Sequence, residues 1–285
     1  MSTLTSILTL LAYEWKRALA RKKILIVIVL TALFEVIPFV VLTQVDAPII
    51  QSILRQFSDL MWLVGVLLPQ GLFIHVIAVL VASGSMAEEY EQGTVDILVS
   101  KPITRMEYLT GKYLGGFTLM ALVSLFLVVM GIVLAEVSFG PQRYLEYAPV
   151  IYVAITFTTL LYYSIGFMLG EVFRRSTLAY LTASTLLIMS VVTQGILVFI
   201  YSLTGDAFYL QVDKALPAWS VTNLPQMVAT ELFLGGRALL PLPQMGLQVG
   251  GTILEAVAVI AIYAVISVAV SALRFTRSDI SAVTS

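Results

Sequence analysis

The chain contains no cysteine and a single histidine, His75. Without cysteine there can be no disulfide, no thiolate metal site and no cysteine nucleophile. One histidine excludes the H-E-x-x-H zinc motif and any site that takes two histidines from one chain. The G-x-S-x-G turn of serine hydrolases is also missing from the sequence. We therefore expect neither catalytic residues nor a metal site.

Charge is also scarce. Charged residues make up 12% of the chain and hydrophobic residues 59%, and the mean hydropathy is +0.98. Soluble domains carry roughly 25% charged residues. The net charge of −1 provides no basic field that would attract nucleic acid, so no nucleic-acid partner is expected. The composition predicts an integral membrane protein.

Long apolar runs give the predicted architecture. A helix that crosses a bilayer needs about 20 apolar residues, and only helices and closed barrels satisfy their backbone polar groups in lipid. We predict a single transmembrane domain over residues 1–285, all-α, with six spans. The expected spans are residues 24–43, 62–84, 113–135, 149–171, 179–202 and 251–273.

The first 23 residues predict a helix that lies in the membrane interface. Leu4, Ile7, Leu11 and Trp15 recur at helical spacing, and charged residues lie off that stripe. A cleaved signal peptide is the alternative, but the apolar part that follows is too long and lacks a convincing cleavage site.

Lysine and arginine predict the orientation. With the N-terminus in the cytoplasm, 12 of the 16 basic residues lie on the cytoplasmic side and 4 lie outside. Because basic residues concentrate in cytoplasmic loops, we expect both termini and residues 85–112 to be cytoplasmic. Residues 203–250 would then form an extracellular connection, with a short helix near Asn223 to Phe233.

The loop between the second and third spans holds most of the candidate functional residues. We expect Met86 to Gln92 to form a short helix with exposed glutamates, ended by a glycine and followed by a proline stop. A solvated loop without a partner is the alternative. The candidate coupling residues are Glu88, Glu89, Glu91, Gly93, Thr94, Pro102 and Arg105.

This run resembles the first cytoplasmic loop of type-2 ABC exporter permeases, which has an E-x-E-x-G-T-x-x-x-L-L-x-x-P-x-x-R-like pattern. Val99 stands where the family often has a second leucine. Among these permeases the chain looks closest to the nitrous-oxide-reductase maturation group. The resemblance implies a permease subunit of the cell membrane. Its coupling helix would contact an ABC ATPase subunit.

The resemblance also implies a second permease subunit, identical or homologous, and export of a substrate along their interface. ATP and magnesium would be bound by the ATPase, because this sequence has no G-x-x-x-x-G-K-[ST] phosphate loop. Membrane lipid is the remaining partner. A membrane anchor or assembly factor without transport is the alternative function, and an intramembrane enzyme is disfavoured by the missing motifs.

Polar residues inside the spans are the second group of candidates. Glu35 and His75 lie at similar predicted depth, so they could pair and reduce each other's desolvation cost. A purely structural hydrogen bond is the alternative. The candidate residues for a transport path or gate are Glu35, Gln70, His75, Thr193 and Gln194.

Overall fold

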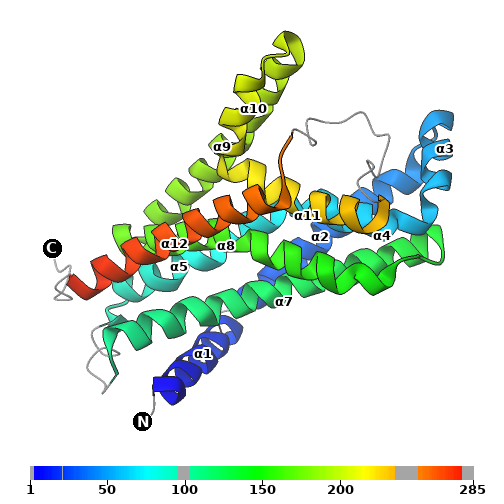
Figure 1. Ribbon diagram of the computed structural model, residues 1–285. Helices are drawn as coiled ribbons and strands as arrows, with labels where there is room; N and C mark the ends of the chain where they lie inside the picture. The colour runs from blue at the N-terminus through cyan, green and yellow to red at the C-terminus, as the bar shows by residue number, and fades with distance from the viewer. Residues whose placement is uncertain (1–2, 21, 96–102, 235–249, 278–285) are drawn as a thin grey trace.

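A computed structural model describes residues 3–20, 22–95, 103–234 and 250–277 (Figure 1). These residues form helices and no strands, and six helices are long and apolar enough to cross a membrane. The predicted all-α membrane fold is confirmed. The longer helices are α1 (Thr3–Ala20), α2 (Lys23–Gln44), α4 (Met61–Gln70), α5 (Phe73–Glu91), α7 (Arg105–Phe139), α8 (Ala148–Phe173), α9 (Ser176–Thr204), α11 (Pro217–Leu234) and α12 (Ile253–Arg277), and the shorter ones are α3 (Pro48–Gln56) and α10 (Ala207–Lys214).

Helices α5 and α8 form the centre of the bundle. Within their most apolar windows 67% of the residues are buried, against 17% in α9 and α12. Their close packing depends on small residues: a Cβ atom added at Gly170 of α8 would lie 2.6 Å from the backbone oxygen of Ser83 on α5. Gly166 faces the same serine. This G-x-x-x-G pair therefore packs two helices of one chain together.

The second predicted span, 62–84, is wrong in one respect, because it is two helices. Helix α4 ends at Gln70, and α5 begins at Phe73 after Gly71 and Leu72. Pro69 lies in the last turn of α4, where it has no N–H for the helical ladder. The Gln70 side chain donates to the backbone oxygen of Thr222 on α11, 3.4 Å away, which anchors the break.

Helix α7 extends well beyond the predicted span, at both ends. It begins with a capping box, in which Thr104 Oγ1 accepts from the Glu107 N–H at 3.2 Å and Glu107 Oε2 accepts from the Thr104 N–H at 2.8 Å. The extra turns carry polar and basic residues, which hydropathy alone leaves out of a span.

Both chain ends lie toward the same end of the bundle, on the side where α7 begins (Figure 1). Arg105 Nη1, at the start of α7, donates to the backbone oxygens of Phe275 at 3.1 Å and Thr276 at 2.9 Å in the last turn of α12. Helices α3 and α10 lie toward the other end (Figure 1). We call the end that holds the start of α7 the basal end.

Helix α11 is longer than the short helix predicted near Asn223 and packs into the bundle. Trp219 and Leu224 are buried, in a core cluster shared with residues of α8 and α12. The connection between the fifth and sixth spans therefore contributes to the core as well as to the surface.

Candidate functional site: the last turn of α5

Four consecutive residues at the basal end of α5, Glu88 to Glu91, contact four other helices. We call these residues the anchor turn. Gln92 separates them from Gly93, where the chain leaves α5 with φ of 62°. The helix end that the sequence predicts at this glycine is confirmed. A β-branched residue would be strained in this conformation, whereas glycine is not.

Glu89 is fully buried and is the most connected residue of the anchor turn. Its Oε1 accepts from Arg17 Nη1 of α1 at 2.6 Å and from Lys112 Nζ of α7 at 2.5 Å. Its other carboxylate oxygen accepts from the hydroxyl of Tyr108, also on α7. Lys112 is itself fully buried. A buried carboxylate is stable here because two cations and a hydroxyl replace its water.

Glu88 and Glu91 connect α5 to α9 on its other side. Glu88 accepts from Tyr180 Oη at 2.9 Å and lies 3.4 Å from Arg17 Nη2. Glu91 Oε1 accepts from the backbone N–H of Ser176 at 2.8 Å, and the Ser176 hydroxyl bonds the same carboxylate. The Glu91 carboxylate therefore caps the N-terminus of α9, where negative charge is favourable.

Tyr90 connects the anchor turn to α8. Its hydroxyl lies 2.9 Å from both carboxylate oxygens of Glu171, which is fully buried. The guanidinium carbon of Arg174 lies 4.6 Å from the centre of the Tyr90 ring, within the range of a cation–π contact. Through four neighbouring residues α5 is thus held to α1, α7, α8 and α9.

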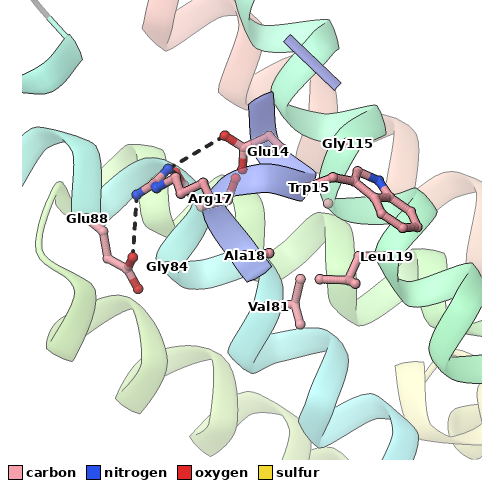
Figure 2. A pocket seen from close by; sticks show the side chains of 11 residues that line it. Glu14, Trp15, Arg17, Ala18, Val81, Gly84, Glu88, Gly115 and Leu119 are labelled. Atoms are coloured by element: carbon pink, nitrogen blue, oxygen red, sulfur yellow. Dashed lines mark hydrogen bonds and ion pairs between the residues drawn. The ribbon is translucent and has the colours of Figure 1, made fainter. Parts of the chain in front are cut away.

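Helix α1 is held to this site by charge as well as by apolar packing. Figure 2 shows Arg17 between Glu14 and Glu88. These three side chains line a pocket of about 40 Å³. Glu14 also accepts from Lys112 Nζ at 2.5 Å. A Cβ atom added at Gly115 of α7 would lie 2.8 Å from Glu14 Cβ, so the glycine allows α1 to approach closely. Gly111 and Gly115, a second G-x-x-x-G pair, therefore pack α7 against α1 of the same chain.

The expectation that all three glutamates are exposed is wrong. Glu89 is buried and Glu88 is half-buried, while Glu91 is exposed but bonded to Ser176. The expected short helix is instead the end of α5, so its side chains face neighbouring helices that composition cannot identify. Among the other candidates, Thr94 Oγ1 donates to the Glu89 backbone oxygen at 3.3 Å, Arg105 caps α12, and Pro102 lies outside the described residues.

The predicted pair of Glu35 and His75 is also wrong. Glu35 is 1% exposed and lies against Gly131 of α7, and neither carboxylate oxygen has a hydrogen-bond partner among the described residues. His75 packs against Tyr162 of α8, with ring centroids 5.6 Å apart. Similar depth did not bring the two together, because their side chains face different helices.

The remaining path candidates are spread over several helices. Gln70 bonds α11, Gln194 is buried on α9, and Thr193 is half-buried beside it. Within the part of the chain that the structure describes, no hydrogen bond joins Gln70, His75 and Gln194. Gln70, His75 and Gln194 are buried inside the subunit.

Sequence reasoning missed most partners of the anchor turn. These are Arg17, Tyr108, Lys112, Glu171, Ser176 and Tyr180. The available signal was a set of charged residues at the edges of apolar runs, such as Lys112 and Glu171. Charges in such places are expensive unless paired, and they therefore indicate partners on other helices.

The comparisons with known proteins agree with this architecture. A family model described as ABC-2 family transporter protein matches residues 8–280. A search of curated proteins gives no match. Because the match covers nearly the whole chain, including every helix that contributes to the anchor turn, the chain belongs to the ABC-2 family of transporter proteins, as a membrane permease component.

Proposed function

We propose that the chain is the transmembrane subunit of an ATP-driven exporter, coupled to separate ATPase subunits that bind ATP and magnesium. The observation that supports this most is the anchor turn. A force on the chain just after Glu91 would act on α1, α7, α8 and α9 at once, since each is bonded to one of four neighbouring residues.

In this proposal the ATPase contacts the segment that follows the anchor turn. Gly93 and Thr94 begin it and Pro102 and Arg105 end it. Glu88, Glu89 and Glu91 position the segment rather than dock the partner, because their carboxylates are bonded within the chain. This differs from the direct docking role that the sequence predicts.

We place the second permease subunit against α9. This helix has a row of exposed apolar side chains that includes Leu181, Ile188, Val192 and Phe199. A Cβ atom at Gly195, within the row, would meet nothing within 4 Å. A glycine in an open apolar stripe permits close approach of another membrane helix. An identical or homologous permease would satisfy this surface.

For the substrate path we propose polar groups buried inside the subunit. Gln70, His75 and Gln194 have buried nitrogen or oxygen atoms without partners among the described residues, and Thr193 is next to Gln194 in the sequence. Opening of the bundle would make these groups available to a polar substrate. Glu35, beside Gly131, is the candidate gate residue. Within the family, we propose that the chain is most like the permeases of the nitrous-oxide-reductase maturation group.

A matched glycine pair tests the coupling. Gly93 and Gly205 both have positive φ, 62° and 70°, and open space at the Cβ position, but they lie at opposite ends of the bundle. Valine at either position introduces the same backbone strain. We expect Gly93→Val to uncouple substrate-stimulated ATP hydrolysis in the complex purified with its ATPase, whereas Gly205→Val should not. Equal activity of both variants would contradict the proposal and favour a membrane anchor without transport.

Topology is tested with single cysteines, since the natural chain has none. We propose a plasma-membrane location with both termini in the cytoplasm. Thr276 is exposed in the last turn of α12, and Glu146 is exposed just before the start of α8. In intact cells an impermeant maleimide should label Glu146→Cys and spare Thr276→Cys. The reverse pattern would invert the orientation.

A further inference from the structure

The first turn of α7 holds the last turn of α12. Arg105 Nη1 donates to the backbone oxygens of Phe275 at 3.1 Å and Thr276 at 2.9 Å. The last carbonyls of a helix have no partner within the helix, so a guanidinium at this end satisfies them and complements the helix dipole. One turn further along α7, the Tyr108 ring stacks on the Phe275 ring, with centroids 5.6 Å apart. We call these four residues the tail clamp.

The tail clamp also contacts the anchor turn and ends the segment that we propose to meet the ATPase. That segment runs from Gly93 to Arg105, and the capping box of Thr104 defines where α7 begins. The Tyr108 hydroxyl donates to Glu89 of the anchor turn. One turn of α7 is therefore bonded to the end of α5 and to the end of α12.

The two ends of α12 belong to different parts of the core. Ala256 and Ile260, near its start, lie in a core cluster with Trp219 of α11. Phe275 lies in the other core cluster, which includes Tyr108. Only 17% of the residues in the most apolar window of α12 are buried, so the described helices enclose little of its length. A helix held in this way can tilt about its outer end when its basal end is displaced.

We propose that Arg105 is a positioning residue that makes the basal end of α12 follow the first turn of α7 when the ATPase acts on the chain. The inference rests on the proposed function and extends it to the sixth span, in addition to the helices bonded to the anchor turn. Movement of the segment between α5 and α7 would then tilt α12 over α8.

Helix α8 is the alternative partner that could set the position of α12. The charge of Arg274 interacts with that of the buried Glu171 of α8. Arg274 is an exposed side chain that can change its rotamer, whereas Arg105 bonds the backbone of α12, which moves only with the helix. We therefore expect the contact with α7 to determine where the basal end of α12 lies.

Distances between spin labels in the complex with the ATPase test the proposal, and labelling is specific because the natural chain has no cysteine. Leu273→Cys/Phe173→Cys places a pair of labels at exposed positions near the basal ends of α12 and α8. Leu254→Cys/Val153→Cys places a second pair near their outer ends. Excess unlabelled chain is added, so that most labelled complexes carry one pair. Trapping the ATPase with ATP, magnesium and vanadate should change the basal distance more than the outer distance.

Arg105→Gln should abolish the change in the basal distance, because it removes the guanidinium that holds the α12 carbonyls. Arg105→Lys keeps a cation at this helix end and should retain part of the change. Phe275→Leu, which removes only the ring stack on Tyr108, should reduce it. Lys214→Gln is the matched control, since it removes a cation that bonds Glu255 in the first turn of α12, and it should leave the change intact.

An unchanged basal response in Arg105→Gln would overturn the proposal and show that α12 follows α8. A basal pair that does not respond to trapping in the unmodified background would overturn it as well. Both results leave the proposed function standing, because Gly93→Val tests that function separately. Failure of the unmodified chain to bind the ATPase would instead overturn the proposed function and this inference together.

Discussion

The anchor turn and the middle of the membrane treat buried polar groups in opposite ways. At the basal end Glu89 is buried with two cations and a hydroxyl around it. Glu35 in α2 is equally buried, but its carboxylate has no hydrogen-bond partner among the described residues. The first arrangement holds several helices in a fixed relation. The second leaves a side chain whose removal breaks no bond that the structure shows.

The largest expected effect is the loss of Glu89. Glu89→Leu leaves Lys112 buried with one carboxylate fewer, and breaking a buried ion pair on one side costs about 3–5 kcal/mol. We expect a marked fall in thermal stability, measured by size-exclusion chromatography after heating in detergent. Glu89→Leu/Lys112→Met removes both charges and should recover part of the loss.

Glu146→Gln is the control for this experiment, because Glu146 is exposed. If Glu89→Leu melted at the same temperature as this control, the anchor turn would not hold the bundle together, and the contrast with Glu35 would disappear.

Asp213 of α10 extends the comparison to a residue outside the spans. It is fully buried, both carboxylate oxygens lack partners among the described residues, and burial raises its pKa from 3.8 to about 7. The folded state therefore holds this proton more tightly than the unfolded state. The resulting contribution to stability is complete below pH 3.8, decreases as the pH rises toward 7, and is lost above that value.

Asp213→Asn should remove this pH dependence. At pH 8 we expect the variant to be more stable than the unmodified chain, by at most about 4 kcal/mol at 1.4 kcal/mol per pKa unit. Near pH 4 the two should be similar. Asp46→Asn, at an exposed position, is the control. A parallel pH profile for Asp213→Asn and the unmodified chain would show that the carboxyl is ionised in the folded protein.

Gly170 and Gly195 allow the effect of close helix packing to be measured apart from that of polar bonds. A Cβ atom at Gly170 would lie 2.6 Å from a backbone oxygen of α5, whereas one at Gly195 meets nothing within 4 Å. Gly170→Ala should destabilise the chain by about 1–3 kcal/mol through overpacking. In the separate subunit Gly195→Ala should be neutral or slightly stabilising, because alanine favours a helix by up to ~1 kcal/mol. Equal melting temperatures of Gly170→Ala and Gly195→Ala would mean that α5 and α8 can move apart without loss of stability.

The smallest effect is expected at Glu35. Because no hydrogen bond is lost, Glu35→Leu should change stability by less than about 1 kcal/mol or increase it, as apolar replacements of poorly paired buried groups often do. Thermal stability and substrate-stimulated ATP hydrolysis should be measured on the same preparation. Unchanged stability with lost hydrolysis would support the gate, while a large loss of stability would reveal a partner that the structure does not show.

The sequence predicts the number of spans well, because length and hydropathy are local properties. It also predicts the helix end near Gly93, since glycine after a helical run favours a helix end. It does not predict the break between α4 and α5, because Pro69 and Gly71 lie in one continuous apolar run. Proline and glycine are common in membrane helices, so neither alone indicates a break.

The partners of the candidate site were beyond local patterns for a different reason. Whether Glu89 faces water or Lys112 depends on how α5 and α7 pack, and they lie in separate spans. The glutamate cluster of the loop looks the same in the sequence in both cases. Glu35 and His75 show the converse error, since equal depth was a necessary condition for pairing but rotation about each helix axis decides the neighbour.

The anchor turn also imposes an order on biogenesis. Arg17 is synthesised before α5, and Lys112 follows Glu89 by 23 residues, so this pair can form early. Ser176 and Tyr180 come 85 and 92 residues after the glutamates they bond, once α8 has been made. Until then Glu88 and Glu91 remain without their α9 partners at the membrane surface. A chain that ended before α9 would therefore keep the Arg17 contact of Glu88 but lack the Ser176 bonds of Glu91, so the α9 side of the anchor turn can close only after the fifth span is made.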